Sequence, residues 1–305
     1  MQSEIILQTH ELKKYFGKVR AVDGVNLSVS KGQIYGFLGP NCSGKTTTIG
    51  MILGLLYPTS GSISLFGEPI TPLKTNPLKR VGALIGAPSL FPYLSAWQNL
   101  DLLARLIPDL PDGRVGDILE LVDLKHAAKR KAGQFSTGMK QRLGIGMSLL
   151  HDPELLILDE PTNGMDPAGM HEIRNLLTAL ADRGVTVFIS SHLLHEVQLI
   201  CDRVAILSQG QVVKEAEVND LQSGTASVKV RVASPTKAVE CLRTLSGCRD
   251  IRPNGTYITV SGVSSQAVIT HLVSNGVIPG EVTTTQLDLE NIFLELTTND
   301  VQEVQ

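Results

Sequence analysis

The residues whose types and spacing most clearly suggest chemistry form one continuous stretch, called the phosphate loop below. In order they are Gly39, Pro40, Asn41, Cys42, Ser43, Gly44, Lys45, Thr46 and Thr47. The stretch fits G-x-x-x-x-G-K-[ST], a pattern in which a glycine-rich turn and the following helix point backbone N–H groups at phosphate oxygens. Lys45 would neutralise phosphate charge during binding and catalysis, and the Thr46 hydroxyl would ligate Mg²⁺. We therefore expect a site for the β- and γ-phosphates of a nucleotide, with a chance glycine turn as the alternative.

A pair of acidic residues, Asp159 and Glu160, directly follows the apolar run Leu155–Leu158. A continuous apolar run is typical of a central parallel strand buried on both faces, and ligands bind at the carboxyl edge of such sheets. Acids are costly there unless a metal or a proton donor meets them. We expect Asp159 to hold Mg²⁺ and Glu160 to polarise the water that attacks the γ-phosphate. A solvated strand end is the alternative.

His192 follows a further apolar run, Val185–Ile189. Because this run also predicts a buried strand, His192 would lie at the same kind of strand end as Asp159 and reach the same γ-phosphate. We therefore take His192 as a catalytic candidate beside Glu160, although a lone histidine is more often structural.

The hydrophobic pattern also predicts the elements that position these residues. Ile34–Leu38 predicts a buried strand before the phosphate loop, and Thr47–Leu56 predicts a helix after it, stopped by Pro58. The alternation in Val25–Ser30 predicts a half-buried strand that pairs in antiparallel fashion with a similar strand at Glu4–Thr9.

Tyr15 and Phe16 are adjacent aromatic residues within Lys13–Lys18, which we expect to be a turn between those strands. Aromatic residues make up only 4% of the chain, so an adjacent pair on a turn is informative. One interpretation is stacking on an adenine ring, and the other is a hydrophobic plug at the strand end. The local pattern favours neither.

Between the strand-rich parts of the chain, Pro88–Leu150 has a mostly helical pattern, which predicts a helical subdomain at about residues 87–150. Further on, Asp166 and Pro167 are the expected N-cap and first residue of another helix. The chain is thus expected to alternate strands with helices around the candidate site.

The last part of the chain predicts a separate small domain. The linker-like Gln222–Thr225 would divide an ATP-binding domain at residues 1–222 from an accessory domain at residues 225–305. Beyond the linker the order is strand, helix, strand, strand, helix and strand, which suggests an α+β ferredoxin-like domain. Asp288–Leu296 predicts one more helix.

Composition bounds the class of protein. The net charge is −3, whereas nucleic-acid-binding proteins usually carry a basic excess, so we expect no specific nucleic acid partner. The four cysteines are scattered without a C-x-x-C pair, which predicts a reduced, cytosolic protein. No apolar run approaches the ~18 residues that a membrane-spanning helix needs. If the protein serves a membrane process, another chain would have to span the membrane.

These motifs, in this order, resemble those of the ATP-binding subunit of an ABC transporter. Phe135–Arg142 is similar to the family signature, Asn163–Asp166 to the loop that crosses the dimer interface, and His192 to the switch histidine. The resemblance implies an α/β fold: a P-loop ATPase domain with a mixed sheet core, an antiparallel β subdomain and a helical subdomain. It also implies that Phe16, with Tyr15 as its neighbour, stacks on adenine.

The signature segment has the features of a helix N-terminus. Ser136 would cap a helix that runs from Met139, so that free N–H groups there face an anion. In the family that anion is the γ-phosphate of ATP held by the opposite subunit, which makes Ser136 and Gly138 candidate contacts. The resemblance implies a homodimer or pseudo-dimer joined head to tail by ATP. It further implies a separate transmembrane permease and a peripheral location on the cytoplasmic face of the cell membrane.

Finer similarity lies in Gly86–Trp97 and Leu289–Leu294, which resemble segments of bacterial exporter subunits for bacitracin and lantibiotics. This implies antibiotic peptides or other drugs as the cargo. The chain departs from the family pattern at Cys42 and Thr137, which replace glycines, and at Gly86, which replaces glutamine or glutamate. A Cβ at Cys42 or Thr137 weakens phosphate binding if φ is positive there. In the family, the side chain missing at Gly86 couples the metal site to the membrane subunit.

Two other functions are compatible with these motifs. Soluble ABC-type ATPases that act on DNA or ribosomes resemble tandem ATPase domains or carry a long coiled-coil insertion, whereas this chain has one phosphate loop and no sustained heptads. A degenerate regulatory subunit that binds ATP with little turnover is compatible with the departures. The leading expectation is an ATPase that powers an exporter.

Overall fold

The structure is a computed structural model that describes residues 4–71, 73–219, 226–248 and 250–286. The chain forms two compact units, Met1–Glu215 and Ala216–Gln305, and each is described by itself. The division falls inside strand β10 (Gln211–Glu217). The predicted linker at Gln222–Thr225 and the predicted helix at Asp288–Leu296 lie outside the described residues.

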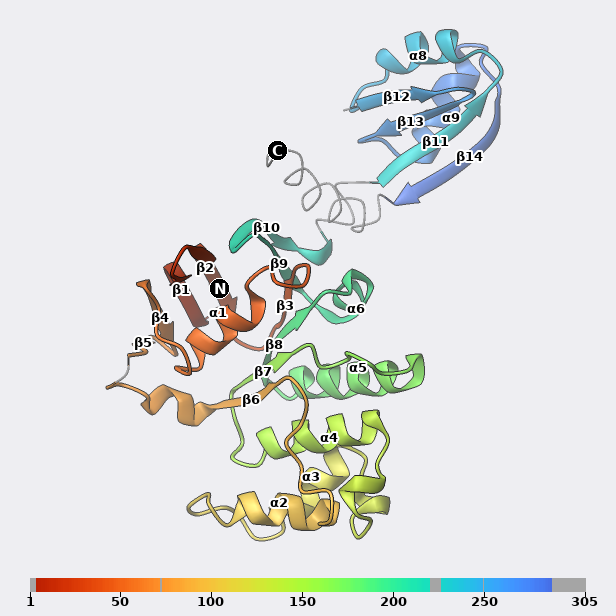
Figure 1. Ribbon diagram of the computed structural model, residues 1–305. Helices are drawn as coiled ribbons and strands as arrows, with labels where there is room; N and C mark the ends of the chain where they lie inside the picture. The colour runs from red at the N-terminus through yellow and green to blue at the C-terminus, as the bar shows by residue number, and fades with distance from the viewer. Residues whose placement is uncertain (1–3, 72, 220–225, 249, 287–305) are drawn as a thin grey trace. The chain divides into compact units, whose positions relative to one another are not determined.

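A six-stranded sheet forms the centre of the first unit (Figure 1). Together with β10, its strands are β3 (Ile34–Leu38), β6 (Val81–Ile85), β7 (Leu155–Asp159), β8 (Thr186–Ser191) and β9 (Arg203–Ser208). They lie in the order β10-β9-β3-β8-β7-β6, and all the pairs from β9 to β6 are parallel. Strands β3, β7 and β8 are buried along their whole length, which confirms the predicted central parallel strands. Their carboxyl ends therefore meet at one edge of the sheet.

A second sheet of four strands is antiparallel. Its strands are β1 (Ile5–Phe16), β2 (Val19–Ser30), β4 (Ser60–Leu65) and β5 (Glu68–Pro69), in the order β2-β1-β4-β5. The apolar residues of the predicted half-buried strand are buried and alternate with more exposed ones; they are Val25, Leu27 and Val29. The ladder between β1 and β2 confirms the predicted antiparallel pair. The regular alternation predicted for the first strand is wrong at its start, where Ile5 is exposed while Ile6 and Leu7 are both buried.

The prediction that Lys13–Lys18 forms a turn is wrong. Tyr15 and Phe16 still belong to β1, where they pair with Arg20 and Val19 of β2. The turn between the strands contains only the two residues after Phe16. The ladder extends this far because a two-residue hairpin turn needs no further residues to reverse the chain.

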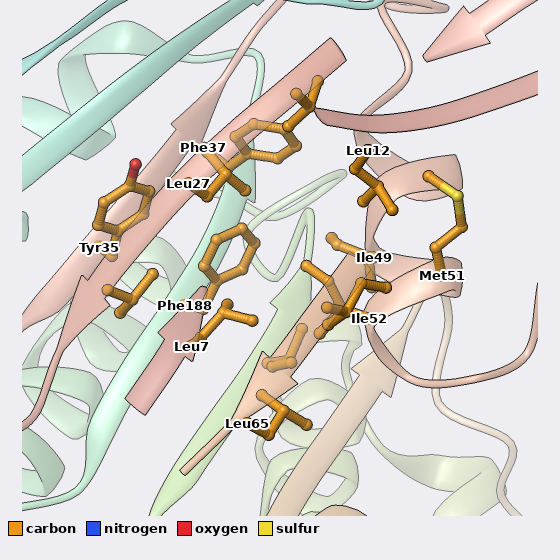
Figure 2. Packing of buried hydrophobic residues seen from close by; sticks show 14 of the residues in the cluster. Leu7, Leu12, Leu27, Tyr35, Phe37, Ile49, Met51, Ile52, Leu65 and Phe188 are labelled. Atoms are coloured by element: carbon orange, nitrogen blue, oxygen red, sulfur yellow. The ribbon is translucent and has the colours of Figure 1, made fainter. Parts of the chain in front are cut away.

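The main hydrophobic core is built from both sheets and from helix α1 (Lys45–Ile52). Figure 2 shows its aromatic centre, where the Phe188 ring stacks on Tyr35 with 5.6 Å between ring centroids and also contacts Phe37. Helix α1 contributes the buried side chains of Ile49, Met51 and Ile52. This packing holds α1 in place, and with it the phosphate loop that immediately precedes the helix.

Helix α1 ends earlier than the sequence predicted. It stops at Ile52 rather than continuing to Leu56, because Gly54 adopts a left-handed conformation with φ of 69°. The N–H of Leu55 then donates to the carbonyl of Gly50 at 2.8 Å. Such a backbone closure satisfies the last carbonyls of a helix, so a glycine and not Pro58 terminates it.

The segment between β6 and β7 is mostly helical, as predicted, with α2 (Ala96–Ala104), α3 (Arg114–Leu121) and α4 (Thr137–Ser148). Helices α5 (Pro167–Asp182) and α6 (Leu194–Ile200) follow β7 and β8. Asp166 caps α5 by accepting from the N–H of Gly169 at 3.0 Å, which confirms the predicted N-cap. Among the described residues, no helix has both the length and the apolar character needed to cross a membrane.

The second unit has the predicted strand and helix order. Its elements are β11 (Ala226–Val232), α8 (Pro235–Arg243), β12 (Asp250–Asn254), β13 (Tyr257–Ser261), α9 (Ser265–Ser274) and β14 (Pro279–Gln286). The sheet is antiparallel in the order β12-β13-β11-β14. Its own core includes Val230 of the sheet, Leu242 of α8 and Leu272 of α9. This unit therefore buries apolar side chains independently of the first.

Candidate active site

The phosphate loop connects the carboxyl end of β3 to α1, and its shape depends on two glycines. A Cβ on Gly39 would lie 2.5 Å from the carbonyl oxygen of Leu207. Gly44 has φ of 108°, and a Cβ on it would lie 2.4 Å from the carbonyl oxygen of Ala21. No L side chain fits either position without displacing backbone. Because Ala21 belongs to β2, its close approach to Gly44 also places this strand directly against the loop.

The loop leaves polar groups without protein partners. The buried hydroxyl of Ser43 has no hydrogen-bond partner among the described residues. The N-cap of α1, Gly44, has no side chain to accept from the first N–H groups of the helix. An orphaned hydroxyl next to an uncapped helix start is an arrangement that a phosphate group satisfies.

Lys45 lies inside this loop and is almost fully buried. Its ammonium group donates to the carbonyls of Gly39 at 2.7 Å and Pro40 at 3.0 Å. It also lies 3.3 Å from Oε1 of Glu160. The cation is therefore held between the phosphate loop and the end of β7, where it can contact phosphate and acid alike.

Asp159 is the buried last residue of β7 and is bonded by hydroxyls on both oxygens. Thr46 donates to Oδ2 at 2.8 Å, and Ser190 donates to Oδ1 at 2.5 Å. Hydroxyl and carboxylate oxygens are the ligands that Mg²⁺ prefers, so Thr46 and Asp159 fit a magnesium site. The structure thus brings together the two residues that the sequence suggested as metal ligands.

Glu160 connects the two other catalytic candidates. Its Oε2 lies 2.7 Å from Nδ1 of His192, while its Oε1 contacts Lys45. Glu160 has φ of 50°, a left-handed conformation that is uncommon for a residue with a side chain. A carboxylate held between a cation and an imidazole at the edge of the sheet can orient a water and accept its proton.

Tyr15 and Phe16 differ in what they can still bind. The Tyr15 hydroxyl donates to Asp23 at 2.6 Å, a bond that raises the pKa of Tyr15 and lowers that of Asp23. Phe16 is 50% exposed, with the ammonium of Lys14 5.0 Å from its ring centroid. Phe16 therefore keeps exposed surface that a flat ring can contact, whereas the Tyr15 hydroxyl is bonded within the β1–β2 hairpin.

Ser136 and Gly138 lie at a different cavity, of about 530 Å³. Ser136 caps α4 by accepting from the N–H of Met139 at 3.2 Å. The described lining of the cavity also contains Asp166, from the loop before α5, but no residue of the phosphate loop. Within one chain, the signature segment and the phosphate loop are thus parts of separate sites.

The three departures from the family pattern have different structural consequences. Cys42 has φ of 66°, so its Cβ adds strain in the loop, whereas Thr137 begins α4 without a positive φ. Gly86 follows Ile85, which pairs with Asp159, and therefore lies at the rim of the site. Gly86 has φ of 64°, and a Cβ added to it would have no atom within 4 Å. A larger residue would therefore have space for its side chain but would need an unfavourable backbone conformation.

Ser190 is the site residue that sequence reasoning missed. It is fully buried, and its hydroxyl contacts both Asp159 and the backbone of Glu160. The available signal was its position two residues before His192 at the end of a buried strand. A serine in an apolar strand indicates a polar partner, but its pattern does not say which one.

Comparisons with known proteins agree with this geometry. Residues 22–163 match the family model described as ABC transporter. The chain is 40% identical over 296 residues to the bacitracin transport ATP-binding protein of Bacillus licheniformis, covering 95% of this chain and 97% of that protein. It is 38% identical over 212 residues to the lantibiotic transport ATP-binding protein of Streptococcus pyogenes, covering 70% and 91%. A solved dimeric ATP-binding cassette in a post-hydrolysis state, bound to ADP and Pi, is similar with a TM-score of 0.63 and 26% identity, covering 70% of this chain and 99% of that chain.

Proposed function

This chain belongs to the ABC transporter family as an ATP-binding subunit that hydrolyses ATP to drive export, and we propose that the exported compounds are antibiotic peptides or related drugs. The observation that carries the proposal is similarity over 95% of the chain to a bacitracin transport ATP-binding protein. That similarity extends past the first unit into the second unit, which contains none of the candidate ATP ligands. The proposal also includes a separate transmembrane permease, because no described helix can cross a membrane. The subunit would then bind peripherally at the cytoplasmic face of the cell membrane.

Gene deletion and complementation test the proposed cargo. We expect deletion to increase susceptibility to bacitracin or to a lantibiotic, and not to an unrelated small antibiotic. The parent gene should restore resistance, whereas a gene encoding Glu160→Gln should not. Unchanged susceptibility to every antibiotic peptide tested, in cells where the protein is produced and hydrolyses ATP, would argue against this class of cargo.

The contacts of the site suggest how this chain's residues divide the reaction. Lys45 can exchange its loop carbonyls for γ-phosphate oxygens, since a charge-assisted bond to phosphate is stronger than one to a carbonyl. Glu160 accepts the proton of the attacking water, and His192 fixes the direction of its carboxylate. Thr46 and Asp159 would hold Mg²⁺, which when bound neutralises developing charge on the phosphates.

The cavity at the signature segment supports a dimer. Ser136, Gly138 and Asp166 line it from one chain, while the phosphate loop lies elsewhere in that chain. We propose that the γ-phosphate held by a second copy, or by a related ATPase domain, meets this cavity. Two ATP molecules would then join two domains head to tail, and hydrolysis would release them.

Cys42 provides a direct probe of the nucleotide site. We expect Mg-ATP to slow alkylation of Cys42 by iodoacetamide several-fold, because Cys42 is exposed in the middle of the phosphate loop. Mass spectrometry of labelled peptides measures the effect. Cys241 and Cys248 serve as internal controls, since they lie in the second unit and their labelling should not change with ATP. Equal labelling of Cys42 with and without Mg-ATP would indicate that the phosphates of ATP do not bind at the phosphate loop.

A chain that ends at residue 222 should fold and bind ATP. The proposed boundary retains every candidate ligand and all of β10, and the core of the first unit shares no residue with the core of the second. Circular dichroism and titration with a fluorescent ATP analogue measure folding and binding, with the full-length chain as the reference. A shortened chain that is folded but does not bind ATP would show that the second unit contributes to the site.

A further inference from the structure

Strand register brings Ser190 next to the catalytic acids. Strand β8 lies between β3 and β7, and Ser190 is directly opposite Asp159 in the parallel β7–β8 pair. Ser190 has no exposed surface. Its hydroxyl is therefore shielded from bulk water, and its hydrogen bonds are made to protein atoms.

The hydroxyl of Ser190 acts both as a hydrogen-bond donor and as an acceptor. It donates its single proton to Oδ1 of Asp159 at 2.5 Å and accepts from the N–H of Glu160 at 3.0 Å. A serine hydroxyl has one donor and two acceptor sites, so the bond to Asp159 uses its whole donor capacity. One side chain thus fixes the carboxylate of one acid and the backbone of the next.

The bond to Glu160 acts at a strained position. A left-handed conformation is unfavourable for a residue with a side chain, and Glu160 has φ of 50°. Its N–H points at Ser190 in this conformation, so the hydrogen bond offsets part of the cost. The same conformation directs the Glu160 carboxylate towards Lys45 and His192. If the backbone relaxed, the carboxylate would leave this position.

The bond to Asp159 acts on the other half of the site. Because Ser190 donates to Oδ1, Oδ2 remains free to face Thr46, from which it accepts at 2.8 Å. Two donors on different oxygens fix the plane of the carboxylate. Removing Ser190 would leave Asp159 able to rotate away from Thr46.

We propose that Ser190 is a positioning residue for ATP hydrolysis, which holds Asp159 in the orientation for Mg²⁺ and Glu160 in the orientation for the attacking water. The proposal rests on the roles assigned above to Asp159 and Glu160. Ser190 itself touches neither substrate nor metal, so its replacement should affect turnover and the response to Mg²⁺ more than nucleotide affinity.

Thr186 offers a matched control on the same strand. It is also fully buried, and its hydroxyl accepts from the N–H of Gly32 at 2.8 Å, at the opposite end of β8 from the acids. Thr186→Val removes a buried hydroxyl of the same strand without altering any contact of Asp159 or Glu160. A purely structural contribution of Ser190 would be matched by this variant.

The experiment uses the full-length chain and compares Ser190→Ala, Ser190→Cys and Thr186→Val with the parent. Three quantities are measured: the steady-state kcat, the Kd of a fluorescent ATP analogue in EDTA and with Mg²⁺, and the melting temperature. We expect Ser190→Ala to lower kcat at least about tenfold, as for the loss of one hydrogen bond to a charged group. Its Kd in EDTA should stay within about twofold of the parent, with a reduced gain in affinity on adding Mg²⁺.

The variants also distinguish a positioning role from a structural one. Ser190→Cys keeps a donor at the same position, although the thiol is a weaker donor and somewhat larger than the hydroxyl, so its kcat should lie between those of the parent and Ser190→Ala. Thr186→Val should lower the melting temperature while kcat stays near that of the parent. If Ser190→Ala does not fold, Ser190→Cys is compared with Thr186→Val instead. A lower kcat for Ser190→Cys than for Thr186→Val supports the positioning role, and equal kcat values contradict it.

A kcat for Ser190→Ala within about twofold of the parent, or a loss matched by Thr186→Val, would overturn the proposal. So would an unchanged response of nucleotide binding to Mg²⁺. A parent-like Ser190→Ala beside an inactive Glu160→Gln would refute only the role of Ser190, whereas an active Glu160→Gln would refute the assigned mechanism.

Discussion

Replacing Glu160 with glutamine should lower the kcat of ATP hydrolysis by ~10²-fold or more, the usual contribution of a general base, while ATP still binds. Glutamine has the same shape as glutamate but no charge and no basic oxygen, so it cannot take the proton of the attacking water. The two oxygens of Glu160 contact Lys45 at 3.3 Å and His192 at 2.7 Å, and glutamine keeps only one of these acceptors. Phosphate release under saturating Mg-ATP measures the effect.

The same variant tests the proposed dimer. If ATP joins two domains and hydrolysis separates them, Glu160→Gln should elute as a dimer in gel filtration with Mg-ATP and as a monomer without it. Glu120→Gln is a suitable control. Glu120 is on α3 and forms an exposed ion pair with Lys125, so the variant removes the same charge at a position outside the candidate site. A Glu160→Gln protein that binds ATP but remains monomeric at every ATP concentration would be incompatible with the head-to-tail arrangement.

Lys45→Ala should weaken ATP binding by on the order of 100-fold, because one or two charge-assisted hydrogen bonds to phosphate are lost. The ammonium is almost fully buried inside the loop, where its hydrogen bonds are shielded from water. The loss should appear in the Kd rather than only in kcat, unlike the effect of Glu160→Gln. Titration calorimetry with ATP measures it directly.

Lys125→Ala is the matched control for this variant, since it removes a lysine whose partner, Glu120, is exposed. It should leave ATP affinity and the melting temperature nearly unchanged, as is usual for a surface ion pair. ATP affinity of Lys45→Ala close to that of the parent, in a protein with a normal melting temperature, would exclude Lys45 from the phosphate site.

Most of the candidate site could be predicted because its residues belong to local patterns. The phosphate loop combines glycines required by close backbone contacts with a lysine and a threonine at fixed spacing. The buried strand β7 has a continuous apolar sequence that ends in Asp159. In both cases a few neighbouring residues carry the whole pattern, so the sequence shows it directly, although Gly39 and Gly44 make their close contacts with the distant residues Leu207 and Ala21.

Predictions failed where a distant contact or a backbone conformation decided the outcome. Helix α1 was predicted to reach Leu56 from its apolar residues, but the left-handed Gly54 ends it sooner. The Lys13–Lys18 segment has turn-like composition, but pairing with β2 keeps Tyr15 and Phe16 in a strand. Propensity is a weak guide at such boundaries because tertiary pairing overrides it.

By itself, the sequence determined which groups the site contains: a lysine and a threonine after a glycine turn, two acids after one buried strand and a histidine after another. Only the tertiary structure decided how they meet. Thr46 and Asp159 are far apart in the chain but 2.8 Å apart in space, and Ser190 joined them only because β8 lies beside β7. The tertiary structure also decided that the Tyr15 hydroxyl bonds to Asp23 while Phe16 remains half exposed. The reason is that hydrogen bonds between strand ends depend on strand order and register, which are properties of the whole packed sheet and not of any local segment.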